Sequence, residues 1–131
     1  MENPGNGVQW QSYQDLVVRQ RGMDLVMAVY AATNGWPGNE QYGLIFQVRR
    51  AAVAIPSNLA EGHGRTGARG FAHHASIAYG SLCEMETQLL IANRLGYIDP
   101  DTGRHLSVLT LKVRRLPRGL LRSLRANSSP H

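Results

Sequence analysis

The stretch IPSNLAEGHGR, residues 55–65, is the part of the chain most typical of a small active site. In a catalytic interpretation Glu61 acts as a general base beside His63, and both side chains must converge on one substrate proton. Nothing else in the sequence supplies a nucleophile or an oxyanion hole to complete such a site. We therefore assign no catalytic residue and expect that the protein is not an enzyme.

In a structural interpretation, the same stretch is the end of a helix that Pro56 bends, because a proline inside a helix removes one backbone hydrogen bond. Short polar side chains then satisfy the freed backbone groups, and glycines end the helix. In this interpretation Glu61 pairs with an arginine such as Arg49 or Arg65, or with an arginine from a neighbouring subunit. We favour this interpretation, and its structural-motif residues are Pro56, Ser57, Asn58, Glu61 and Gly62.

Several side chains have the chemistry of metal ligands, namely His63, His73, His74, Cys83 and Glu84. Structural zinc needs four ligands that meet at one point, and the sequence contains no HxxxH or CxxC pair. Cys83, the only cysteine, is expected to pack as a small apolar residue. We expect neither a metal nor a cofactor.

The basic residues are concentrated towards the end of the chain. The formal net charge is +5, and no Asp or Glu follows Asp101. Four arginines in this region are spaced by three, four and three residues, so they share one face of a helix. Such a face is either a phosphate-binding track, without base stacking, or a solvated or interface surface, and both interpretations remain open. The candidate nucleic-acid-binding residues are Arg115, Arg118, Arg122, Arg125 and Lys112.

A second group of charged residues is assigned to ion pairs or to a subunit interface. Glu84 and Glu86 are two residues apart and point to different helix faces, so they do not form a catalytic carboxylate pair. We expect one of them to meet Arg49 or Arg50 across a helix or subunit boundary.

All of these residues lie on or beside four segments in which apolar residues recur every three or four positions, as is typical of helices. Turn-forming residues separate the segments at 34–39, 62–70 and 99–103, and Gly96 is expected to cap the third helix. The expected core positions are Met23, Val26, Met27 and Tyr30 in the first segment; Leu44, Val48, Ala51, Ala52, Ile55 and Leu59 in the second; Phe71, Ala75, Ala78, Leu82, Met85, Leu89 and Ala92 in the third; and Leu106, Leu109, Val113, Leu116, Leu120 and Leu124 in the fourth.

This pattern predicts an all-α protein, an antiparallel up-down-up-down four-helix bundle over residues 13–126. Residues 1–12 are expected to form a flexible leader and residues 127–131 a flexible tail. Pro117 interrupts the fourth segment, and we expect a bend or break in that helix near Leu116. No apolar run approaches the roughly 18–20 residues needed to span a bilayer, and no signal peptide is recognisable, so we expect a cytoplasmic protein.

Two blocks of the sequence resemble a known family: QVRRAAVAIPSNLAEGHGR, residues 47–65, and GSLCEMETQLLIANRLGYI, residues 80–98. In that order they are similar to the four-helix-bundle proteins found in intervening sequences of bacterial large-subunit ribosomal RNA genes. That family is related to the accessory variability determinant of diversity-generating retroelements. The resemblance covers about residues 15–125, and the chain departs from the family pattern at residues 19–22, at His73 and His74, and at Pro117.

The resemblance implies a bundle that assembles into a ring-shaped homopentamer, and no catalytic activity comes with it. The retroelement relatives work with a reverse transcriptase and bind nucleic acid through a basic surface. We therefore expect a non-enzymatic oligomeric scaffold that binds RNA or DNA, with a reverse transcriptase as a further candidate partner. The alternative is a structural or protein-interaction module of unknown partner that does not bind nucleic acid.

Overall fold

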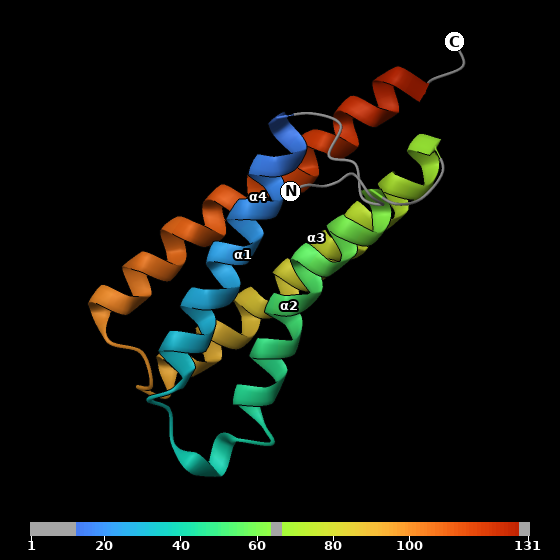
Figure 1. The fold of residues 1–131 in the computed structure, drawn as a ribbon. Coiled ribbons are helices and arrows are strands. Elements are labelled where there is room, and N and C mark those ends of the chain that lie inside the picture. Colours follow the sequence, from blue (N-terminus) through green and yellow to red (C-terminus); the bar gives the residue numbers. More distant parts are fainter. Residues whose placement is uncertain (1–12, 64–66, 129–131) are drawn as a thin grey trace, which may run out of the picture.

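The fold was analysed in a computed structural model that describes residues 13–63 and 67–128, with side chains described for 17–62 and 70–115. Four α-helices account for most of these residues, and no strand occurs among them (Figure 1). The helices are α1 (Tyr13–Thr33), α2 (Leu44–His63), α3 (Gly67–Arg94) and α4 (Pro100–Ser128), and a short 3-10 helix, η1 (Gly38–Glu40), lies between α1 and α2.

The four helices are arranged as an antiparallel bundle. Each helix packs against its neighbours in the chain, and α1 also packs against α4, which closes the ring of four. Consecutive helices run in opposite directions, so the topology is up-down-up-down (Figure 1). The all-α, four-helix prediction is confirmed. Within the described residues, no helix has both the length and the apolar composition needed to cross a membrane.

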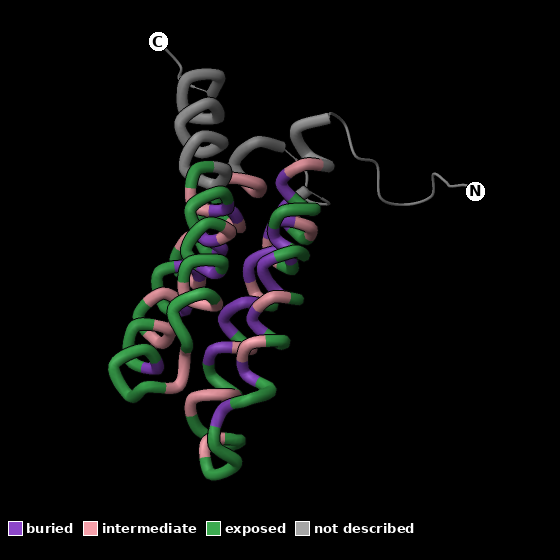
Figure 2. The backbone as a smooth tube through the Cα atoms, turned by 90° about the vertical axis from the view of Figure 1, so that its left-hand side faces the viewer, coloured by how far each residue is buried: buried purple, intermediate pink, exposed green. Residues whose placement is uncertain are grey.

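The core faces of α2, α3 and α4 agree with the sequence pattern. Buried positions run along the inner sides of these helices and exposed positions along the outer sides (Figure 2). Ala75 and Ala78 of α3 are fully buried, and small side chains at these positions let α2 approach closely. The described predicted positions are either buried or packed against the core, the buried ones being Val48, Ala51, Ala52, Ile55, Leu59, Ala75, Ala78, Leu82, Met85, Ala92, Leu106 and Val113.

The predicted core face of α1 is wrong. Met23, Met27 and Tyr30 are 43%, 65% and 38% exposed, and only Val26 among the predicted positions is buried. Apolar residues surround this part of α1 on nearly every side, so their periodicity alone does not define one inner face. The residues of α1 that enter the core are Val18, Leu25, Val26 and Val29.

Gly62 permits a close approach between α2 and α3. Gly62 was predicted to end α2, but it lies buried inside the last turn, and the helix continues to His63. A Cβ atom at Gly62 would stand 2.7 Å from the Cβ of His74 and 3.2 Å from the ring of Phe71, both on α3. Gly22 plays a similar part in α1, where an added Cβ would stand 3.1 Å from the Cβ of Pro56.

Neither proline ends its helix. α2 continues through Pro56 and α4 continues through Pro117, so of the predicted bend or break near Leu116 the break is wrong. A proline removes one backbone hydrogen bond, while the turns on both sides retain theirs and tertiary packing stabilises the helix. The glycine-rich connector is also shorter than the predicted 62–70, because α2 ends at His63 and α3 begins at Gly67.

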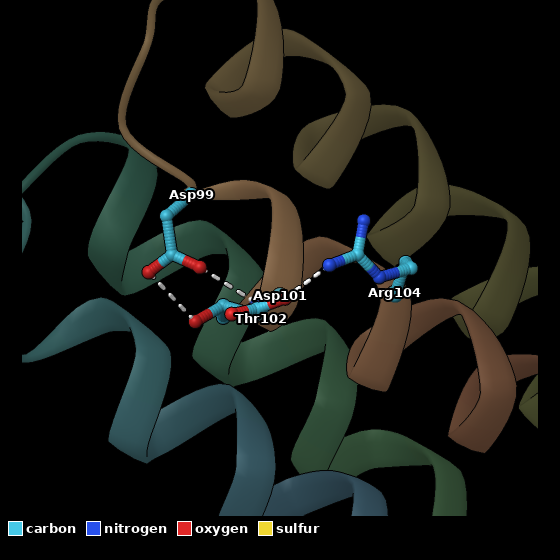
Figure 3. A network of polar contacts seen from close by, with 4 residues as sticks. All are labelled: Asp99, Asp101, Thr102 and Arg104. Carbon is cyan, nitrogen blue, oxygen red and sulfur yellow. Dashed lines mark hydrogen bonds and ion pairs between the residues drawn. The ribbon is translucent and has the colours of Figure 1, made fainter.

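The link between α3 and α4 ends one helix and starts the next. Gly96 has a φ of 82°, as predicted for a capping glycine; its N–H donates to Asn93 O (3.0 Å), and the next N–H donates to Ala92 O (3.0 Å). Asp99 caps α4: Oδ1 accepts from the Thr102 N–H (2.7 Å) and Oδ2 from the Thr102 hydroxyl (3.0 Å) (Figure 3). These hydrogen bonds lower the pKa of Asp99 below its ordinary value.

Tyr97 joins the two links at this end of the bundle. Its hydroxyl donates to Glu40 Oε2 (2.8 Å), and Glu40 Oε1 accepts from the Leu44 N–H (3.2 Å) at the start of α2. The Tyr97 ring also packs on the buried Trp36, with 5.7 Å between ring centroids. The hydrogen bond to the Glu40 carboxylate raises the pKa of Tyr97, because an ionised phenol has no proton to donate.

We predict that Gly62→Ala lowers the free energy of unfolding by roughly 1–3 kcal/mol, because the new Cβ forces α2 and α3 apart. Gly80→Ala is the matched control: Gly80 is exposed within α3 and an added Cβ meets nothing within 4 Å. That control should gain about 0.5–1 kcal/mol from helix propensity. Urea unfolding of the three proteins checks this, and equal effects of the two substitutions would contradict it.

We also predict that Tyr97→Phe destabilises the protein at neutral pH and that this difference disappears at high pH. The folded pKa of Tyr97 is raised above 10.0, so its hydrogen bond contributes fully below pH 10 and is lost as the pH rises through the raised pKa. Urea unfolding of wild type and variant between about pH 8 and pH 11.5 measures the difference. A difference that stays constant across this range would show that the Glu40 contact is not responsible.

Candidate nucleic-acid interface

The predicted basic track lies on the second half of α4. The helix is continuous through residue 128, so the positions of the four arginines fall on one side of a single helix. The side chains of Lys112 and Arg115 are exposed. Those of Arg118, Arg122 and Arg125 lie outside the described side chains.

The basic residues of α4 whose side chains are described divide into a paired and an unpaired group. In the first half, Arg104 pairs with Asp101 of the same helix (Figure 3). Arg114 pairs with Glu86 of α3, and both side chains are about one-third exposed. Lys112 and Arg115 form no hydrogen bond or ion pair with another described side chain. Their charges therefore face solvent rather than an acid of the described bundle.

Arg49 connects α2 to the end of α1. Its Nε donates to Thr33 Oγ1 (2.8 Å), and Nη2 donates to Asn34 Oδ1 (3.2 Å) and to Tyr30 O (3.5 Å). The guanidinium also lies 4.4 Å from the centroid of the Tyr30 ring, which is a cation–π contact. A cation at a helix C-terminus is favourable, so Arg49 has a structural role inside one chain rather than pairing with Glu84 or Glu86.

The two glutamates of α3 have different surroundings. Glu86 pairs with Arg114 of α4 within the chain, and the predicted contact of one glutamate with Arg49 or Arg50 across a subunit boundary stays a prediction. Glu84 is exposed and accepts a hydrogen bond from Gln88 (3.5 Å) on the same helix. Arg50 is exposed as well.

The 55–65 stretch contributes contacts between helices. Asn58 Nδ2 donates to Ala54 O (2.8 Å), which leaves Asn58 Oδ1 to accept from His74 Nδ1 of α3 (3.3 Å). The carbonyl that Pro56 leaves without its helical partner is that of Ala52, so Asn58 satisfies a different group. Ser57 and Glu61 are exposed, and the side chain of His63 lies outside the described part.

The candidate metal ligands do not gather at one point in the described part of the chain. His73 and His74 are in edge-on contact, with 5.3 Å between ring centroids. Among the described residues, no three His, Cys, Asp or Glu side chains are placed to share a metal ion. Cys83 is exposed, so its predicted packing is wrong, since it lies one position beside the buried Leu82.

Two exposed apolar faces lie on opposite sides of the bundle. Tyr30 of α1 contacts Arg49 of α2, so the α1–α2 face lies over the junction of these helices. The exposed apolar residues at helical spacing from these two positions are Met23 and Met27 on α1 and Phe46 and Val53 on α2. The other face is an open groove between α3 and α4, with exposed Leu90, Val108 and Leu111. Among the described residues each helix contacts only its neighbours in the ring, so these two sides face away from each other.

Comparison with known proteins identifies the family. The family model of the 23S rRNA-intervening sequence proteins matches residues 14–119, and no curated protein matches the chain. The matched region includes Arg115 and Arg118, while Arg122 and Arg125 lie beyond it. Since the match spans most of the chain and the chain folds as four helices, this protein belongs to the family of 23S rRNA-intervening sequence proteins.

Proposed function

We propose that the chain is a non-enzymatic, homo-oligomeric scaffold that binds nucleic acid through the basic surface of α4. The observation that carries this proposal is the exposure of Lys112 and Arg115 without an acidic partner among the described residues. They lie in a segment, residues 102–131, that contains seven basic residues and no acidic one. The family name links its members to intervening sequences of 23S rRNA, so RNA is the first ligand to test.

The chemistry of this surface favours contacts to phosphate. Arginine and lysine neutralise phosphates and release counterions, so binding weakens steeply as the salt concentration rises. Residues 102–131 contain no Phe, Trp or Tyr, and stacking on bases has no platform there. Binding of this kind positions a nucleic acid without reading its sequence.

The two apolar faces support association of the chain with itself. They differ in composition and point in opposite directions, so a contact between them is head-to-tail. Head-to-tail contacts close into a ring when the rotation between subunits allows it. A ring-shaped pentamer is the assembly implied by the family resemblance. It would repeat the α4 surface in every subunit, and avidity rises with the number of sites that engage together.

The alternative is a structural or protein-interaction module without nucleic-acid binding. The exposed apolar faces favour it, because contiguous exposed apolar surface commonly marks protein contacts. A reverse transcriptase is the candidate partner that the retroelement relatives imply. In that case the α4 arginines form a solvated or interface surface.

We predict that the protein binds structured RNA and duplex DNA with an affinity that falls as salt rises. A variant with Arg115, Arg118, Arg122 and Arg125 changed to glutamine should lose most of this binding. Fluorescence anisotropy with nuclease-treated protein, over about 50–200 mM salt, gives the slope of log affinity against log salt. Four lost contacts should flatten that slope by roughly 3–4. If the wild-type protein binds neither RNA nor DNA at low salt, nucleic-acid binding is wrong and the structural or protein-interaction module is favoured.

We predict head-to-tail assembly from two complementary variants. Leu90→Glu with Val108→Glu should block the groove, and Met27→Glu with Phe46→Glu should block the α1–α2 face. All four residues are at least 52% exposed, so these changes should leave folding nearly unchanged. Native mass spectrometry should find each variant monomeric, and an equal mixture should form a dimer through the two intact faces. If either variant alone keeps the wild-type assembly, head-to-tail contact is wrong.

A further inference from the structure

The positions of basic residues on α1 and α4 can be compared because the two helices pack side by side (Figure 1). Ala32 of α1 and Thr102 of α4 line the same pocket at one end of the bundle, so they lie at a similar level along it. Arg21 lies eleven residues before Ala32, and Lys112 lies ten residues after Thr102. At about 1.5 Å per residue in antiparallel helices, Arg21 and Lys112 are at nearly the same level along the bundle.

Arg21 and Lys112 also lie on the sides of their helices that adjoin. Arg21 and Ala32 are about three turns apart, so Arg21 shares the side of α1 that meets α4 near Thr102. On α4, Leu111 and Arg114 line the groove with α3 and mark the opposite side. Lys112 does not line that groove, and it follows Leu111 by about 100° around the helix, towards α1.

The charge of this seam is predominantly positive. Arg21 and Lys112 are exposed, and neither forms a hydrogen bond or ion pair with another described side chain. Asp24 is the acid on this side of α1, and it accepts a hydrogen bond from Gln20 Nε2 (3.0 Å). It forms no ion pair with a described cation. Two like charges at one level therefore stand on either side of the α1–α4 seam.

We propose that Arg21 and Lys112 form a phosphate-binding pair across the α1–α4 seam, which extends the surface of Arg115 onto α1. The ligand is the phosphodiester backbone of RNA or DNA, and the inference rests on the proposed function. Axes of packed helices are about 8–10 Å apart, so a strand held by both residues crosses α4 towards α1. Arg21 is thus a candidate ligand contact on α1, outside the α4 residues that the spacing of arginines in the sequence predicts.

The test compares Arg21→Gln and Lys112→Gln with Arg94→Gln, a matched loss of one exposed charge at the C-terminal end of α3. Binding of labelled duplex RNA and duplex DNA is measured across a salt series. Arg21→Gln and Lys112→Gln should each weaken binding roughly fivefold to tenfold at 0.1 M salt and flatten the salt slope by about one. Arg94→Gln should change neither quantity. Arg21→Lys should retain most of the affinity, because it keeps the charge.

The outcomes separate this inference from the function on which it rests. If the wild type binds and Arg21→Gln binds equally well with the same salt slope, the seam is not part of the site and the α4 surface acts alone. If the wild type binds neither nucleic acid, the proposed function fails, and the seam with it. A loss on both RNA and DNA supports a contact to the shared backbone, and a loss on one identifies that nucleic acid as the ligand. Thermal melting of Arg21→Gln should match the wild type, since Arg21 is exposed.

Discussion

The close packing of α2 against α3 is the constraint on which the rest of the bundle depends. Buried alanines of α3 and Gly62 of α2 let the two backbones approach, and Asn58 of α2 hydrogen-bonds His74 of α3 beside that contact. α1 then packs on α2 through Gly22 against Pro56, and Arg49 holds its C-terminal end. α4 completes the ring, with the Glu86–Arg114 pair at its contact with α3.

These contacts between helices determine which charged side chains are left without a partner in the chain. At the end of the bundle that holds the α1–α2 and α3–α4 links, the acids have local partners. Asp99 caps α4, and Asp101 pairs with Arg104. Glu40 caps α2 and accepts a hydrogen bond from the Tyr97 hydroxyl. Exposed ion pairs of this kind contribute little stability, but they neutralise cations locally. Farther along α4 no acid follows in the sequence, and among the described residues Lys112 and Arg115 have no acidic partner, whereas Arg114 pairs with Glu86 of α3.

The sequence predicts the core positions correctly in those helices whose apolar and polar side chains are clearly separated on opposite faces. Alanines and large apolar residues in the third segment define one inner side, and the structure confirms it. α1 carries apolar residues on several sides, and its inner face is chosen by which helices it meets, as Gly22 against Pro56 illustrates. For the candidate site, spacing is enough to place Arg115 on a shared helix face with the later arginines. The choice of Thr33 as the partner of Arg49, and the shared level that we infer for Arg21 and Lys112, depend on how distant segments pack, which no local pattern encodes.

The continuity of α4 through Pro117 links the described part of the basic surface to the rest of it. If the helix ended at residue 116, a new segment could leave the bundle at another angle, and its arginines would not continue the line of Arg115. In one helix each residue advances about 1.5 Å and 100°, so the three-four-three spacing preserves a single side over all four positions. The continuity of α4 thus gives the four arginine positions a common side. The pocket that Ala32 and Thr102 both line relates this helix to α1, and from it we infer that Arg21 lies level with Lys112.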